Sequence, residues 1–357
     1  MTEEMTQRTT EDPLAETWTL PRTDTESVLL GHGSGGGLTA ELLTGLVGPE
    51  LGLSGPAEDA AVVALDHGEV IVSTDSFVVT PRVFPGGDIG ALAVNGTVND
   101  LAMRGARPVG ICLAYIVEEG LRLDELRAVT ASAARAAAGA GVRVVAGDTK
   151  VVGRGAGDGL YITTTGFGLR PPDARISAAN GRSDDVVLIS GPIGLHGTAV
   201  LSAREGLGFE GEIASDTRPL YDLVAAMLDA GGEHVHALRD PTRGGLAGAL
   251  IDLAAASAVG VELDESAIPV PGQVVGACDL LGLDPLHVAN EGCLIAFVAP
   301  EAALEVLAAM RANPAGTQAR PIGRAVAKQP GRVRMHTTLG DTRRIGKLTG
   351  EQLSRIC

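Results

Sequence analysis

The sequence predicts an α/β protein of two domains with mixed sheets. The chain has 357 residues, which is too long for one compact hydrophobic core. Short apolar runs rich in β-branched residues alternate with helical patterns in both halves, and Pro171-Pro172 separates them. The expected segments are a disordered extension at 1–26, an N-terminal domain at 27–172, a C-terminal domain at 173–336 and a flexible tail at 337–357.

The first half begins with polar, acidic residues without a hydrophobic period, which is typical of disorder. The patterns that follow predict strands at Asp59–Leu65, Val70–Asp75, Val109–Val117, Val142–Ala146 and Leu160–Leu169, helices at Asp88–Arg104 and Asp124–Ala138, and a loop at Thr80–Gly87. Gly105 is the expected stop of the first of these helices.

The second half repeats the alternation. It predicts strands at Val186–Ser190, Val261–Leu263, Cys293–Val298 and near 320–335, and helices at 196–205, 217–230, Arg243–Ala256, 272–281 and 301–312. From Thr337 onward the hydrophobic period fades, which indicates a mobile tail whose last ten residues would span roughly 33 Å if extended.

Composition excludes several classes of partner and fold. The formal net charge of −16 argues against nucleic acid or an anionic membrane as the main partner. No uncharged apolar run reaches membrane-spanning length, and the first residues do not resemble a signal peptide, so we expect a cytoplasmic protein. The four cysteines are far apart with no CxxC pair, a spacing that fits neither a zinc site nor a disulfide framework.

Carboxylates recur in turns beside the predicted strands. Asp59 opens a strand, Asp75 and Asp148 follow strands, and Asp240 precedes a helix. Oxygen ligands from several segments suit Mg²⁺, which usually also binds substrate phosphates. Each residue taken alone is better explained as a helix cap or turn residue. Their recurrence beside glycine-rich turns favours a shared site.

The helix predicted from Asp88 is apolar on nearly every face. Asp88, Asn95 and Asn99 fall on one polar stripe of it, and a buried polar stripe needs partners or a ligand. The Asn99-Asp100 pair is therefore a candidate contact for a metal-bound nucleotide. A structural hydrogen-bond network is the alternative.

Three further motifs are ambiguous alone. The glycine-rich segment Gly31–Gly37 could wrap a phosphate with its backbone, although it lacks the Walker A ending and could be a linker. Lys150, beside Asp148, could contact phosphate or act as a base. Glu291 lies in a turn before a strand, a position that taken alone indicates the protein surface.

Cys357 is the last residue of the sequence. A thiol on a mobile end can be charged by one protein and carried into the site of another. The prenylation pattern has its cysteine fourth from the end, so it does not fit. Cys357 is therefore a candidate carrier of a reacting group, with Arg355 close enough in sequence to lower its pKa.

Together these segments resemble the HypE family of hydrogenase maturation proteins, within the aminoimidazole ribonucleotide synthetase (PurM-like) superfamily. The resemblance runs from about residue 30 to the end. It rests on HGSGGG (32–37), EDAAV (58–62), STDSFVV (73–79), FPGGDIGALAVNGTVNDLAMRGA (84–106), AGDTKVV (146–152), DPTRGGLA (240–247), ANEG (289–292) and the terminal RIC.

The resemblance implies a PurM-like homodimer that binds Mg²⁺ and ATP. The Mg²⁺ carboxylates would be Asp59, Asp75, Asp100 and Asp240. The ATP contacts would be Asp59, Asp75, Asn99, Asp100, Asp148 and Thr149.

The resemblance also implies a reaction. A HypF-type carbamoyltransferase would load the thiol of Cys357, and ATP-dependent dehydration would convert the carbamoyl group to a thiocyanate. Its cyanide would pass to iron on a HypC–HypD complex for a NiFe-hydrogenase. Glu291 would take protons from the substrate nitrogen, while Lys150 would either relay protons or stabilise phosphate.

The chain departs from the family pattern at an N-terminal extension, at Ser354 where proline is expected, and at Cys293 where lysine is expected. Two other classes of function stay open. One is a small-molecule enzyme of the same superfamily, such as a selenophosphate synthetase or thiamine phosphate kinase, although Ser34 occupies the loop where the former carries a reactive cysteine. The other is a thiol carrier without catalysis.

Overall fold

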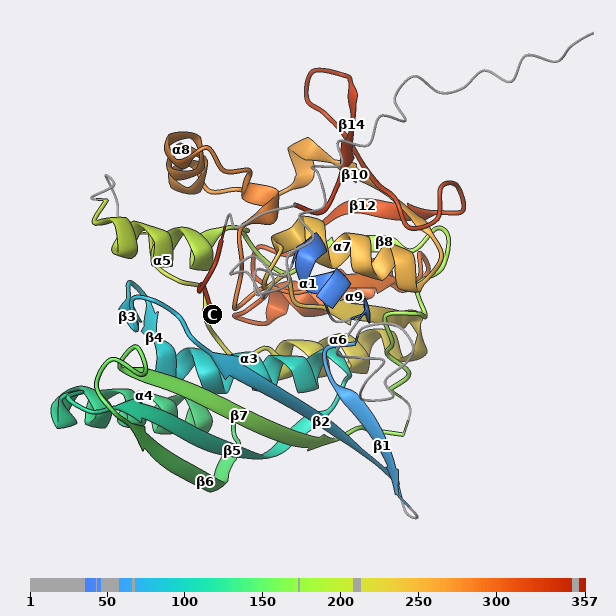
Figure 1. Cartoon of the computed structure of the whole chain (residues 1–357). Helices are drawn as coiled ribbons and strands as arrows, with labels where there is room; N and C mark the ends of the chain where they lie inside the picture. Colours follow the sequence, from blue (N-terminus) through green and yellow to red (C-terminus); the bar gives the residue numbers. More distant parts are fainter. Residues whose placement is uncertain are drawn as a thin grey trace, which may run out of the picture.

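The computed structural model describes residues 36–42, 44–45, 58–65, 68–172, 174–207, 213–348 and 353–357. The predicted extension at 1–26 and Gly31–Gly35 of the glycine-rich segment lie outside these residues. Each half contains one large sheet with helices packed on it (Figure 1). This arrangement confirms the predicted mixed α/β architecture.

The first sheet has the strand order β1-β2-β7-β5-β6, and only β5 and β6 run parallel. Helices α3 and α4 pack on one of its faces. The opposite face lacks such a cover within the described chain, because side chains along β7 alternate between buried and half-buried or, at Leu169, exposed. The elements of this half are α1 (Gly37–Leu42), β1 (Ala61–Leu65), β2 (Gly68–Phe77), β3 (Val83–Phe84), β4 (Gly87–Asp88), α3 (Ile89–Met103), β5 (Arg107–Glu118), α4 (Leu123–Gly139), β6 (Arg143–Val152) and β7 (Leu160–Leu169).

Helix α3 is the shared wall between the two halves. Asp88 caps its N-terminus by accepting hydrogen bonds from the backbone amides of Gly90 and Ala91. Its last turn ends at Arg104, followed by Gly105 with φ +70°. Ala102 and Met103 at that end belong to the same apolar cluster as helix α6 of the second half. The helix predicted at Asp88–Arg104 is therefore confirmed, and it is buried on nearly all sides.

The second sheet has the strand order β14-β13-β10-β12-β8-β11-β9. Its middle strands are covered on both faces, because Val187 and Ile189 of β8 join one apolar cluster while Leu188 joins another. Helix α7 belongs to the first of these clusters, and α6 and α9 to the second. The elements are β8 (Val186–Ile189), α5 (Leu195–Glu205), α6 (Tyr221–Gly231), η3 (Gly232–His234), β9 (Val235–Arg239), α7 (Gly245–Ala256), β10 (Gly260–Asp264), η4 (Glu265–Ala267), α8 (Gly272–Leu281), η5 (Pro285–His287), β11 (Ile295–Val298), α9 (Ala303–Ala312), β12 (Arg320–Val326), β13 (Val333–His336) and β14 (Thr342–Ile345).

The structure extends the sequence prediction in three places. Strand β6 continues to Val152 beside β5, so Asp148 and Lys150 lie within a strand and not after one. The short β3–β4 pair occupies the predicted loop at Thr80–Gly87. In the tail, β14 pairs with β13 and buries Ile345 in the core, which the fading hydrophobic period did not indicate. Among the described residues, no helix combines the length and apolar character that crossing a membrane requires.

Candidate active site

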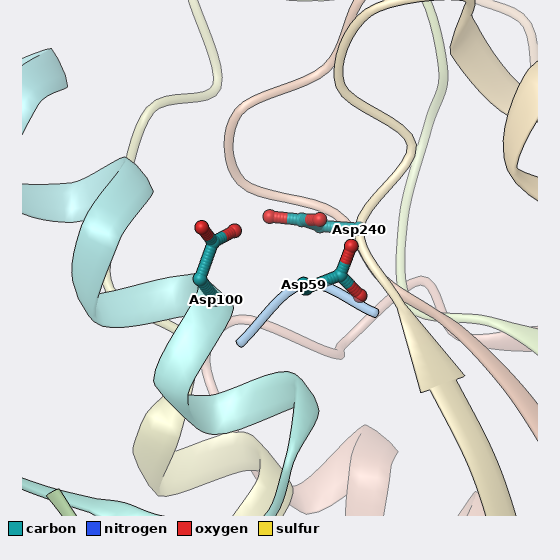
Figure 2. A group of neighbouring side chains, drawn as sticks. All are labelled: Asp59, Asp100 and Asp240. Atoms are coloured by element: carbon teal, nitrogen blue, oxygen red, sulfur yellow. The ribbon is translucent and has the colours of Figure 1, made fainter. Parts of the chain in front are cut away.

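Three carboxylates meet where the two halves join (Figure 2). Asp59 comes just before β1, Asp100 lies on α3, and Asp240 follows β9. One oxygen of each lies within 4.8 Å of the others. Residues from two strand ends and a helix, far apart in the sequence, thus form one acidic cluster.

Burial and mutual repulsion dominate the electrostatics of this cluster. Burial raises the pKa of Asp59 to about 6, although Arg239, whose Nε lies 3.2 Å from an Asp59 oxygen, opposes the rise. Burial and the charge of Asp59 raise the pKa of Asp240 to about 8, and burial with three neighbouring aspartates raises that of Asp100 well above its usual range. Buried like charges of this kind suit a divalent cation, and oxygen ligands suit Mg²⁺.

Asp75 lies beside the cluster but is not one of its three converging members. Thr97 of α3 donates a hydrogen bond of 2.6 Å to one Asp75 oxygen, and burial raises the pKa of Asp75. Ser73, two residues earlier on β2, donates a hydrogen bond of 2.6 Å to Asp100. Hydroxyl groups of β2 and α3 therefore fix the orientation of both carboxylates.

Asn99 points to the second half and not to the cluster. Its Oδ1 accepts the backbone N–H of Leu220 at 2.8 Å, and its Nδ2 donates to the main-chain oxygens of Arg218 at 3.0 Å and Glu291 at 3.3 Å. Asn99 is buried, with only 1% of the residue exposed. These contacts match the structural network that the sequence left open as the alternative, while its ATP contact stays a prediction.

Glu291 is buried in a loop that is held from two sides. Asp216 accepts the backbone N–H groups of Glu291 and Gly292, both at 3.0 Å. The Glu291 side chain approaches α3, where a Cβ added to Gly96 would lie 3.7 Å from its Oε2. Burial, followed by the charges of Asp240, Asp216 and Asp75, raises the pKa of Glu291 well above its usual range.

The thiol of Cys357 lies within the electrostatic influence of Glu291 and of the acidic cluster. Burial raises the pKa of its thiol to about 12, against the effect of Arg243, while the charges of Glu291, Asp75 and Asp100 raise it further. Cys357 is half-buried, and the expectation that Arg355 lowers the pKa of its thiol is wrong for this conformation. The nearby cation is Arg243, because Arg355 instead pairs with Asp158.

The predicted residues of the AGDTKVV motif lie elsewhere in the same chain. Lys150 donates to both oxygens of Asp148, at 2.8 Å and 2.6 Å, and both side chains are more than half exposed on edge strand β6. Three strand spacings, roughly 14 Å, separate β6 from β2. Thr149 alternates to the face that α4 covers, where it lines a cavity of about 710 Å³ with Tyr115.

Several residues of the site were not predicted from the sequence. Arg243 lies three residues after Asp240, in a motif in which only the carboxylate indicated a function. Asp216 lies in an otherwise unremarked loop, and only the fold brings it to Glu291. Cys293, expected to replace a cation near Glu291, points into the core, where it contacts Ser190 and the Gly191 main-chain oxygen.

Sequence comparisons place this geometry in a known class. The family described as AIR synthase related protein, N-terminal domain, matches residues 57–170, and the corresponding C-terminal domain family matches residues 182–336. The fold and site are therefore those of an AIR synthase-related, PurM-like protein.

Closer relatives define the family within this class. The chain is 51% identical over 330 residues to carbamoyl dehydratase HypE of Bradyrhizobium diazoefficiens, covering 92% of this chain and 95% of that protein. A HypE structure in complex with ATP matches with a TM-score of 0.79 and 43% identity, over 93% of this chain and all of that one. A HypE–HypF complex matches with a TM-score of 0.82 and 41% identity, over 86% of this chain and 99% of that one. The chain belongs to the HypE family of carbamoyl dehydratases.

Proposed function

We propose that the protein uses ATP to dehydrate a carbamoyl group on the Cys357 thiol to a thiocyanate, which supplies cyanide for a NiFe-hydrogenase iron centre. The observation that carries this proposal is the position of the thiol. The half-buried thiol lies close enough to Glu291, Asp75 and Asp100 for their charges to raise its pKa, so a group on the sulfur would face both a base and a phosphate site. Membership of the HypE family supports the same reaction.

Asp59, Asp100 and Asp240 would hold Mg²⁺, with Asp75 beside them. Three converging carboxylates with raised pKa values, of which Asp240 is buried and the other two half-buried, fit a divalent cation, because it would neutralise their charges. When bound, Mg²⁺–ATP would supply a phosphoryl group that makes the amide oxygen a leaving group, with the metal neutralising phosphate charge.

Glu291 is placed to accept protons from the substrate nitrogen. Its carboxylate is buried near the thiol, and its loop is fixed by Asp216, so the base is held in one position. Arg243 opposes the raised pKa of Glu291 and thereby favours the ionised form that a base requires. Arg243 also favours negative charge on the sulfur.

Lys150 would enter the site from a second copy of the chain. Strand β1 pairs only with Gly68–Val72 of β2, so within the described residues no strand lies beside the outer edge of Ser73–Phe77. Strand β6 is likewise an edge, and it is exposed along almost its whole length. A homodimer that pairs these edges would place the partner's Lys150 near Asp75.

The remaining partners follow from the proposed reaction. One similar structure is a HypE–HypF complex, which supports a HypF-type carbamoyltransferase as the protein that loads Cys357. A HypC–HypD complex would receive the cyanide, and the reaction would take place in the cytoplasm. The acidic net charge continues to argue against nucleic acid or an anionic membrane as a partner.

Intact mass spectrometry tests the proposal. The purified chain is incubated with a HypF-type transferase, carbamoyl phosphate and Mg²⁺–ATP, beside Cys357→Ala. We expect a carbamoyl adduct that then loses one water, and no adduct on Cys357→Ala, which should still bind ATP. An adduct that never loses water would leave a passive carrier. No adduct at all would favour a small-molecule enzyme of the superfamily.

A further inference from the structure

The main-chain oxygens of the last four residues all accept hydrogen bonds from the body of the protein. Arg204 of α5 donates to Ser354 at 3.0 Å and to Arg355 at 2.6 Å. The backbone N–H of Val78 donates to Cys357 at 3.0 Å. Arg204 also donates to the Thr80 oxygen at 2.9 Å, so one guanidinium joins the tail to the segment that follows β2.

His196, also on α5, binds the fourth of these main-chain oxygens, that of Ile356. Its Nε2 lies 3.0 Å from the main-chain oxygen of Ile356 and its Nδ1 lies 2.7 Å from the Ser215 hydroxyl. A carbonyl oxygen only accepts, so Nε2 carries the hydrogen and Nδ1 accepts from Ser215. The ring is fully buried, and Phe84 packs against it in an edge-on contact at 5.3 Å.

The tail side chains add further contacts with the body of the protein. Ile356 and Leu353 pack in the apolar cluster that contains Phe77 and Phe84. Arg355 donates to the Val78 oxygen at 3.0 Å and pairs with Asp158. Among the described residues 353–357, Leu353, Arg355 and Ile356 therefore dock through their side chains, and Ser354 docks through Arg204. The half-buried Cys357 packs at the edge of this apolar cluster, close enough to Glu291 for the charge of that carboxylate to raise the pKa of the thiol.

We propose that His196 and Arg204 are positioning residues that hold the tail with the Cys357 thiol in the active site. They bind main-chain oxygens, so they fix the path of the backbone without occupying the sulfur. Cys357 is half-buried when docked, so full access by a transferase requires these contacts to break. The pair thus sets how the thiol divides its time between loading and dehydration. This inference rests on the proposed function.

The first test measures docking without any assumption about the reaction. Iodoacetamide labelling of Cys357 is followed by peptide mass spectrometry in Arg204→Met and His196→Ala, with Arg127→Met on the exposed face of α4 as a matched control. Loss of these hydrogen bonds should speed labelling of Cys357 by ~10-fold or more. Labelling of half-buried Cys112 should not change. Wild-type labelling rates at Cys357 in both variants would overturn the proposal.

The second test measures the chemical step. Each variant is carbamoylated first, and loss of water is then followed after Mg²⁺–ATP is added. We expect dehydration to slow by ~10-fold while the affinity for ATP is unchanged, with partial recovery in Arg204→Lys and His196→Gln, which keep one donor. Faster labelling with an unchanged dehydration rate would overturn the positioning role. Absence of dehydration in the wild type would instead contradict the proposed function, and the labelling result would still stand.

Discussion

Two acidic motifs that look alike in the sequence occupy opposite ends of the first sheet. The carboxylates around β1 and α3 lie where the two halves meet, and their pKa values rise because burial disfavours the charged forms and, at Asp100, because neighbouring aspartates repel it. The Asp148–Lys150 pair lies on the outer edge strand, mostly in solvent, and its pairing with Lys150 lowers the pKa of Asp148.

Acidic residues beside glycine-rich turns can therefore be recognised in the sequence as candidate site residues. Their position in the sequence does not show whether they bind a cation directly or pair with a side chain of the protein. The buried cluster needs a cation to be stable as a set of charges. The exposed pair already has its counter-ion, so it gains a role in the site only if another copy of the chain covers it.

Asp100→Asn should reduce the Mg²⁺-dependent affinity for ATP by about 100-fold or more, because it removes a converging ligand. Asp75→Asn should cost only about 10-fold, as expected for a residue that supports the ligands. Isothermal titration with ATP, with and without Mg²⁺, measures both, and exposed Asp229→Asn on α6 is the matched control. Equal affinity in Asp100→Asn and the wild type would exclude the metal assignment.

Mixed dimers of Lys150→Met and Glu291→Gln should recover about half of the wild-type dehydration rate, although each variant alone is inactive. In such a dimer one site combines intact Glu291 with the partner's intact Lys150, and the other site lacks both. Differently tagged chains allow the mixed dimer to be purified before the assay. An inactive mixed dimer would show that both residues act from the same chain.

Asn99→Ala should lower the free energy of unfolding by about 3 kcal/mol, because it leaves the buried partners of Asn99 without hydrogen bonds. Urea denaturation measures this loss, and ATP titration of the folded variant separates it from binding. A large loss of ATP affinity at unchanged stability would return Asn99 to the nucleotide site.

The metal-free protein should become less stable as the pH rises. The folded-state pKa values of Asp59, about 6, and Asp240, about 8, exceed the unfolded value of about 3.9, so the folded state favours the protonated forms. Their stabilising contribution is complete below pH ~4 and is lost as the pH passes through 6 and 8. Thermal unfolding between pH 5.5 and 8.5 should show this fall, and Mg²⁺ should raise the Tm more at pH 8.5. A Tm that rises with pH in metal-free buffer would contradict the assignment.

The sequence was sufficient for most of the fold. The apolar period of α3 and the strand patterns predicted their elements, because burial follows directly from local periodicity. It also indicated Asp59, Asp100 and Asp240, which the structure brings together. It could not distinguish Asn99 as a bridge from Asn99 as a ligand, since both need a buried amide.

Contacts between distant segments account for what was missed. Asp216 and His196 act on residues 75 and 160 positions away, and no local pattern encodes such pairings. The docked tail was missed for a related reason. Its burial comes from surfaces of α5 and the segment after β2, so the tail itself needs little hydrophobic period.

The loop of Glu291 has a consequence for the timing of the reaction. Asp216 and Asn99 bind its backbone from both halves of the molecule, so its carboxylate has little freedom to approach a substrate. The substrate on the tail must therefore move to Glu291. If arrival of the tail limits turnover, the turnover rate will fall as solvent viscosity rises, because a tethered chain moves by diffusion. An internal rearrangement of the protein will not set the rate.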